Sequence, residues 1–243
     1  MNGLTLTRDY LLDLMVRMAH HSTAIEGNSL TLSNAISILL EKYVPVAAPL
    51  REIHEIENYE GLMTTLIDSL KSCEPICLDL IRKFHKRLCI NAIQGEAGAF
   101  KEAGNRIAGA DFDTAKPCMV IQDLTQWVDD ADCLFENCKS EHDFFSALAR
   151  LHIRFERIHP FSDGNGRVGR ALVVFACMSN GMAPSVVAKE DRSKYIELLR
   201  KENTAGLAEY FCGLSRFEAE RIEKFRGNGF PIMELKGRDL ARG

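Results

Sequence analysis

The sequence predicts an all-α protein, because apolar residues recur at helical spacing through most of its 243 residues. Glycine and proline fall between the periodic segments, where helices are expected to end. One long segment, residues 95–117, lacks the helical period and contains several glycines. We expect this segment to be a functional loop or a short hairpin inside a compact helical domain.

The first predicted helix covers residues 8–25. Residues on one of its faces recur at steps of four and three: Leu11, Met15, Met18, Ser22 and Ile25. Thr7 is placed to cap this helix, and Gly27 is placed to end it. The same reasoning predicts further helices over residues 32–42, 52–69, 78–89, 123–136, 142–157, 167–180, 192–202 and 207–225.

The bulk composition is that of an ordinary globular protein, with 46% hydrophobic and 26% charged residues. The formal net charge of -4 predicts no general attraction to nucleic acid. The apolar run at residues 171–178 is far shorter than the roughly 20 residues of a membrane span. Arg8 and Asp9 interrupt the start of the chain, where a signal peptide would need apolar residues. We therefore expect no membrane or nucleic-acid partner and a cytoplasmic location.

Cysteine and histidine spacing gives no metal signature. None of the 8 cysteines stands in a CxxC pair, and we expect reduced, mostly buried thiols. His152 and Glu156 are four residues apart and are interpreted as a solvated or core-edge pair.

The chemistry is concentrated in residues 158–170, IHPFSDGNGRVGR. Its glycine-rich turn leads into a helix, and such a turn presents several free backbone N–H groups to an anion. Arg167 and Arg170 share a face of the first helical turn, where positive charge is unfavourable unless an anion lies nearby. The turn therefore predicts a phosphate site.

Two further side chains of this segment supply reactive groups. Asp163 is a hard oxygen ligand beside the predicted phosphate site, where Mg²⁺ is the natural ion. His159 can act as a general base near neutral pH. A base, a metal carboxylate, an anion site and two arginines together indicate phosphoryl or nucleotidyl transfer.

The segment resembles the signature of the Fic family, H-x-F-x-[DE]-G-N-G-R-x-x-R. Every fixed position matches: His159, Phe161, Asp163, Gly164, Asn165, Gly166, Arg167 and Arg170. The resemblance extends over residues 52–214. It implies a Fic-type helical core with a small β-hairpin flap over the site.

The resemblance also implies roles for these residues. His159 would take the proton from a hydroxyl of a target protein, which then attacks the α-phosphate of ATP, and Asp163 would hold Mg²⁺. Arg167 would neutralise the phosphate chain, and the Asn165 side chain would help to cradle it. The residues implied to bind ATP are Gly164, Asn165, Gly166, Arg167, Arg170 at the γ-phosphate and Tyr195 against the adenine. The flap near Asn105–Asp113 would hold the target as an added strand.

Residues 22–27, STAIEG, resemble the inhibitory motif of the family, [ST]-x-x-x-E-[GN]. Ser22 and Glu26 are four apart, so their side chains can meet. A carboxylate in the last helical turn opposes the helix dipole, which favours a cationic partner. The resemblance implies that Glu26 pairs with Arg170, occupies the γ-phosphate position and inhibits the enzyme. The position of the motif is that of the subgroup with an N-terminal inhibitory helix.

We therefore interpret the chain as a protein adenylyltransferase that modifies a Ser, Thr or Tyr hydroxyl and is inhibited by Glu26. Three different functions stay open: an enzyme that uses Glu26 to remove AMP, a non-catalytic nucleotide-binding module, and a Doc-like kinase. The last typically has lysine where this chain has Gly166. The expected organisation is an N-terminal segment with the inhibitory helix (1–50), a Fic core (51–219) and a helix end with a flexible tail (220–243). Self-association is left open.

Overall fold

The computed structural model of the protein describes residues 4–105, 113–226 and 231–235. The predicted all-α fold class is confirmed, and most predicted helices end within a few residues of the observed bounds. The α-helices are α1 (Arg8–Ile25), α2 (Leu32–Ile36), α3 (Leu50–Lys71), α4 (Leu78–Cys89), α5 (Val120–Glu136), α6 (Glu141–Ile158), α7 (Asn165–Ser179), α8 (Arg192–Arg200) and α9 (Thr204–Phe225).

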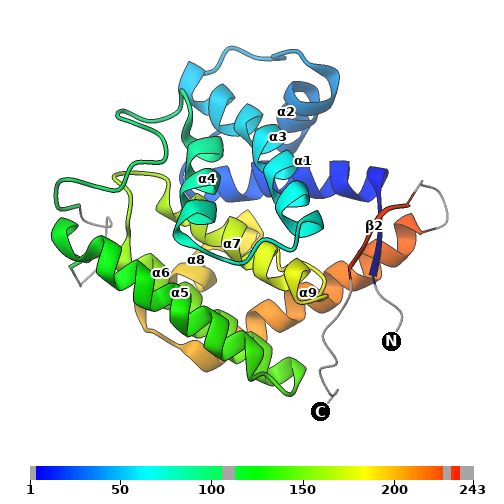
Figure 1. Ribbon diagram of the computed structural model, residues 1–243. Coiled ribbons are helices and arrows are strands. Elements are labelled where there is room, and N and C mark those ends of the chain that lie inside the picture. Colours follow the sequence, from blue (N-terminus) through cyan, green and yellow to red (C-terminus); the bar gives the residue numbers. More distant parts are fainter. Residues whose placement is uncertain (1–3, 106–112, 227–230, 236–243) are drawn as a thin grey trace.

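Helix α7 is the centre of the molecule. All of its residues except Gly166 and Ser179 are buried, because it packs against α1, α3, α4 and α6 (Figure 1). A helix that is buried all round must be apolar on every face, and the run of residues 171–178 meets this condition. The run that is too short for a membrane span is therefore the core of the domain.

Short polar signals fix where α1 and α6 begin. The Thr7 hydroxyl accepts a hydrogen bond from the backbone N of Tyr10 at 3.2 Å, which confirms the predicted cap. Ser140 and Asp143 form a reciprocal capping box at the start of α6. The caps fix the first residues of α1 and α6. Residues 22–27 and the signature segment lie at the other ends of these two helices.

The predicted helix over residues 32–42 has two parts. After α2 the helix widens into a π-helix (Ser37–Glu41), and Lys42 ends it in the left-handed conformation with φ 60°. Helical periodicity alone does not distinguish an α-helix from a short π-helical turn.

A small antiparallel sheet joins segments that are far apart in the sequence. Strand β1 (Leu4–Thr7) precedes α1, and strand β2 (Pro231–Leu235) follows α9. Leu6 pairs with Met233, and the two strands lie side by side at the right of Figure 1. The sequence predicts a flexible tail, but residues 231–235 form a strand because a partner is available at the other end of the chain. The division into segments 1–50, 51–219 and 220–243 stays a prediction.

The predicted flap lies mostly outside the described residues, since 106–112 are not among them. Its described ends lie together. The Thr114 hydroxyl donates to the backbone oxygen of Asn105 at 2.8 Å, and Lys101 Nζ donates to the Asn105 and Thr114 side chains at 2.8 and 3.0 Å. Asn105 Nδ2 also donates to the backbone oxygen of Phe161 at 2.7 Å, which places the base of this loop beside the signature segment.

The expectation of mostly buried cysteines is wrong. All 8 cysteines are free thiols, but only Cys89 and Cys177 are buried. Cys73 follows the end of α3, Cys118 lies in a single 3₁₀ turn, and Cys133 lies on the exposed side of α5. Each of these three cysteines is exposed because it lies on the solvent-facing side of its turn or helix. This placement outweighs the usual preference of cysteine for the core.

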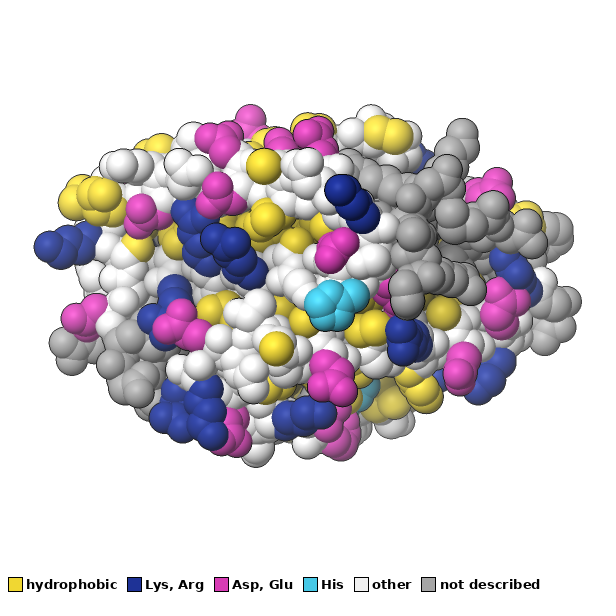
Figure 2. Space-filling view, turned by 90° about the horizontal axis from the view of Figure 1, so that it is seen from below, with side chains coloured by type: hydrophobic (Ala, Val, Ile, Leu, Met, Phe, Trp, Pro, Cys, Tyr) yellow, Lys and Arg dark blue, Asp and Glu magenta, His cyan; other side chains and the backbone are white. Residues whose placement is uncertain are grey.

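Charges of both signs are mixed on the face shown in Figure 2, where Lys and Arg side chains lie between Asp and Glu side chains. The part of this face that the structure describes therefore has no broad basic surface of the kind that binds nucleic acid. Within the described ranges, each helix lacks the apolar length that crossing a lipid bilayer would require.

Candidate active site

The signature segment is a loop between α6 and α7, with left-handed residues at both ends. His159 ends α6 with φ 50°, and Gly164 precedes α7 with φ 77°. A Cβ on Gly164 would lie 2.4 Å from Cys89 Sγ, so both the backbone conformation and the space require glycine. The fold thus turns the chain sharply between a buried helix end and a buried helix start.

His159 has the tautomer of a general base. Its Nδ1 lies 3.2 Å from the backbone oxygen of Glu156, which can only accept, so Nδ1 carries the proton and Nε2 keeps its lone pair. Burial, and to a lesser degree the charge of Lys101, lowers the pKa of His159 to about 4. The imidazole is therefore neutral at neutral pH and can take up a proton through Nε2.

The start of α7 has no side-chain cap. Gly164 provides no side-chain cap, which leaves N–H groups of the first turn available. A Cβ on Gly166 would lie 2.3 Å from Glu26 Oε1, so a carboxylate oxygen already rests against this turn.

The Asn165 side chain has a different role from the predicted one. Its Oδ1 accepts from the backbone N of Phe161 at 2.8 Å, and its Nδ2 donates to the backbone oxygen of Phe161 at 2.7 Å. Asn165 is 1% exposed. The side chain closes the loop, and only the backbone N–H of Asn165 remains for an anion.

Asp163 lies at the mouth of the site, with 48% of its side chain exposed. Arg51 Nη2 lies 3.7 Å from its Oδ2, and Arg167 Nη2 lies 3.6 Å from its Oδ1. Arg167 itself is 1% exposed, and its Nε and Nη1 have no hydrogen-bond partner among the described residues. Its charge is balanced by Asp163 and by Glu55, whose Oε1 lies 3.5 Å from Nη1, while two of its donors have hydrogen-bonding capacity left over.

Arg170 joins α7 to α1. Its Nε donates to the Ser22 hydroxyl at 2.9 Å, and its Nη2 donates to the Ser22 backbone oxygen at 2.9 Å and to Glu26 Oε1 at 2.7 Å. The predicted pairing of Glu26 with Arg170 is therefore present. Arg192 Nε also donates to the backbone oxygen of Ile25 at 2.8 Å, which holds the end of α1 in place.

Tyr195 is not placed to stack on a base in this structure. It is 1% exposed, and its hydroxyl lies 2.7 Å from His152 Nε2 in the core. His152 and Glu156 are also buried, at 3% and 8% exposure, so their interpretation as a solvated or core-edge pair is wrong. The helical spacing was correct, but α7 and α8 cover the face on which both residues lie.

Two buried residues of the site were missed. His85 Nδ1 accepts from the backbone N of Gly98 at 2.7 Å, its Nε2 lies 3.1 Å from the backbone oxygen of Asp163, and its ring stacks on Phe161. Glu55 accepts from Asn28 Nδ2 at 3.0 Å and lies 3.5 Å from Arg167. Both residues lie on helices whose sequence carries only the core period, so no local signal marks them.

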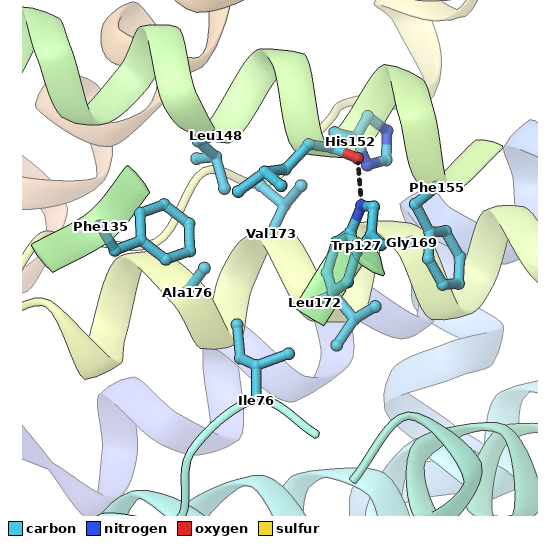
Figure 3. A pocket seen from close by; sticks show the side chains of 11 residues that line it. Ile76, Trp127, Phe135, Leu148, His152, Phe155, Gly169, Leu172, Val173 and Ala176 are labelled. Atoms are coloured by element: carbon cyan, nitrogen blue, oxygen red, sulfur yellow. Dashed lines mark hydrogen bonds between the residues drawn. The ribbon is translucent and has the colours of Figure 1, made fainter. Parts of the chain in front are cut away.

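A small apolar cavity lies between α5, α6 and α7 (Figure 3). Trp127 and Leu172 line it, and Trp127 Nε1 donates to the backbone oxygen of Leu151 at 2.8 Å. Its volume of about 10 Å³ is no more than one water molecule requires. We interpret it as a packing defect of the core and not as a ligand site.

The described residues form a helical domain in which a buried, neutral histidine and a short loop precede a helix start without a side-chain cap. The model of the Fic/DOC family matches residues 75–177. These residues are a Fic/DOC family domain.

Proteins named protein adenylyltransferase are similar to most of the chain. One from Caenorhabditis briggsae is 29% identical over 210 residues, which are 86% of this chain and 40% of that protein. One from Drosophila melanogaster is 30% identical over 84% of this chain and 40% of that protein. The chain thus spans about 40% of the length of these relatives.

Solved structures agree on the fold. A Fic domain containing signaling protein from Bacteroides thetaiotaomicron superposes with a TM-score of 0.79 over 93% of this chain and 92% of that chain, at 23% identity. Fic-1 from C. elegans superposes with a TM-score of 0.74 over 89% of this chain and 64% of that chain, at 27% identity.

Proposed function

We propose that the protein transfers AMP from ATP to a Ser, Thr or Tyr hydroxyl of a target protein. The observation that carries the proposal is that Asp163 and Arg170 lie at the uncapped start of α7, which a short loop joins to His159 at the end of α6. The names of the relatives support the same reaction, and because the chain spans about 40% of their length, the activity is a proposal for this chain.

The residues present fit a nucleotide with Mg²⁺. Glu26 already places a carboxylate oxygen against Gly166 and Arg170, so the position accepts an anionic oxygen. Mg²⁺ is commonly held by one or two carboxylates together with phosphate oxygens, and Asp163 is a half-exposed carboxylate at this point. When bound, Mg²⁺ would neutralise the charge that develops on the phosphates.

The protein residues then account for the proton and the charge. His159 Nε2 takes the proton of the target hydroxyl, whose oxygen forms a bond to the α-phosphorus while the bond to the β-phosphate oxygen breaks. Pyrophosphate leaves with the electron pair of that bond. The N–H groups at the start of α7 and the Arg170 guanidinium hold the phosphate chain.

We further propose that Glu26 inhibits this reaction. Its carboxylate occupies one guanidinium nitrogen of Arg170 and the space in front of Gly166, which a phosphate would need. The 41% exposure of the Glu26 side chain allows it to rotate away into solvent. Loss of this carboxylate should therefore open the site without unfolding α1.

The test compares wild type, Glu26→Gly and the double variant Glu26→Gly with His159→Ala, incubated with Mg²⁺ and ATP labelled on the α- or the γ-phosphate. Self-modification is read on a denaturing gel. We expect strong incorporation of α-label in the single variant alone. Retention of the γ-label instead would identify phosphorylation, as expected of a Doc-like kinase, and overturn AMP transfer.

Removal of AMP and binding without turnover lead to different results with the same proteins. If the enzyme removes AMP with the help of Glu26, Glu26→Gly should lose the ability to clear a target that already carries AMP. If the domain only binds nucleotide, His159→Ala should leave its biological effect unchanged.

A target bound at the flap, a cytoplasmic location and self-association stay predictions, to be tested by cross-linking, cell fractionation and sedimentation.

A further inference from the structure

A second carboxyl group lies buried beside Arg170. Glu156 of α6 is 8% exposed, and its Oε1 has no hydrogen-bond partner among the described residues. This oxygen approaches α7 so closely that a Cβ on Gly169 would lie 2.2 Å from it. Gly169 directly precedes Arg170 in the chain, so the carboxyl reaches α7 next to the arginine.

Charged and titratable groups of four helices surround Glu156. His152 Nε2 of α6 lies 3.8 Å from Glu156 Oε1. Arg170 of α7, Glu26 of α1 and Tyr195 of α8 are close enough to interact with it electrostatically. Burial lowers the pKa of His152 to about 3, so this histidine stays neutral at neutral pH. Of the residues named here, Arg170 is therefore the one that is positively charged at neutral pH.

The protonation of Glu156 follows from these neighbours. Burial raises the pKa of Glu156 to about 7, the charge of Arg170 opposes that rise, and the charge of Glu26 adds to it. Removing Glu26 should therefore lower the pKa of Glu156 and favour its carboxylate form. The proton would pass to solvent.

Arg170 needs such a partner when Glu26 leaves. Only 7% of its side chain is exposed, and an unpaired charge in that environment is costly. Between the departure of Glu26 and the arrival of a phosphate, the remaining contacts of the guanidinium to Ser22 are to neutral groups.

We propose that Glu156 is a positioning residue for Arg170. Its protonated form is favoured while Glu26 or a phosphate neutralises the arginine, and its carboxylate form is favoured, as the counter-ion of the arginine, when neither is present. The part that concerns the phosphate rests on the proposed function. The part in which Glu156 replaces Glu26 as the counter-ion of Arg170 does not depend on catalysis.

The test titrates protein with ¹³C-labelled glutamate carboxyls by NMR across the neutral pH range. Wild type and Glu26→Gln are compared, and Glu156→Gln assigns the resonance. We expect Glu156 to titrate near neutral pH in wild type and about one pH unit lower in Glu26→Gln. Glu74 is the internal control: hydrogen bonds from Lys83 and Ser69 lower its pKa, and its midpoint should be the same in both proteins. An unchanged Glu156 midpoint overturns the proposal, whether or not the protein transfers AMP.

A calorimetric titration tests the phosphate part. A non-hydrolysable ATP analogue with Mg²⁺ is bound to Glu26→Gly in two buffers of different ionisation enthalpy. We expect proton uptake on binding in this variant and its loss in Glu26→Gly with Glu156→Gln. Equal proton uptake in both proteins, or none in either, overturns the assignment of the phosphate as the partner that reprotonates Glu156.

Discussion

The contacts around Gly166 show how a single missing side chain lets α1 approach the start of α7. Glu26 approaches the bare Cα face of Gly166 and, from there, reaches Arg170. An alanine Cβ at this position would lie 2.3 Å from Glu26 Oε1 and 3.0 Å from Arg170 Nη1. The absence of a side chain at Gly166 therefore allows the Glu26 carboxylate to lie against the start of α7.

We expect Gly166→Ala to displace Glu26 from Arg170 and to lower the free energy of unfolding by about 1–3 kcal/mol, as overpacking does. In a Glu26→Gly background, Gly166→Ala should lower the free energy of unfolding by clearly less, because the Glu26 carboxylate that the new Cβ would overlap is absent. Urea denaturation of wild type, the two single variants and the double variant gives the coupling energy between positions 26 and 166. Equal costs in both backgrounds would show that Glu26 does not rest on Gly166.

At the scale of elements, α1 is held at both ends by polar contacts. Its C-terminal end is fixed by Arg170 and Arg192. Further towards its start, Arg17 Nη1 donates to Glu218 Oε2 of α9 at 2.9 Å, and the Tyr10 hydroxyl donates to Glu218 Oε1 at 2.9 Å. Helix α1 is thus a part of the fold and not an appended arm.

Removing Glu218 should therefore destabilise the whole domain. Glu218→Ala leaves Arg17 and Tyr10 without their buried acceptor, and losing one partner of a buried ion pair typically costs about 3–5 kcal/mol. We expect a loss of this size in the free energy of unfolding, measured with urea. The matched control is Glu220→Ala on the exposed side of α9, which should change it by about 0.5 kcal/mol or less.

Much of this architecture could be predicted from the sequence because helices are encoded locally. The period of α1, its Thr7 cap and the whole signature segment are read within a few residues. The pairing of β1 with β2 could not be predicted, because each strand is short and its partner lies at the other end of the chain. His85 and Glu55 were missed for a related reason: each looks like an ordinary helix residue until packing places it against the signature segment.

At the scale of the whole molecule, the buried Glu156 carboxyl makes stability depend on pH. Its pKa is about 7 in the folded protein against an ordinary value of 4.5, so the folded state binds the proton more tightly. The stability associated with this proton is present below about pH 4.5 and is lost as the pH rises through 7.

Glu156→Gln should remove this dependence. Relative to wild type, the variant should gain stability as the pH rises from acid to alkaline, by roughly 3 kcal/mol in total, since one pKa unit corresponds to about 1.4 kcal/mol. Thermal or urea unfolding of both proteins at a series of pH values measures the difference. A difference that is independent of pH would mean that Glu156 is ionised in the folded protein at neutral pH.

The anchoring of α1 on α9 also sets an order of events during protein synthesis. Tyr10 and Arg17 are separated from Glu218 by 208 and 201 residues, so the start of α1 cannot make these contacts until nearly the whole chain has left the ribosome. Arg170, the partner of Glu26, emerges earlier. Helix α1 is therefore fully seated only after α9 has been made, and contacts between such distant residues form slowly because a long loop must close.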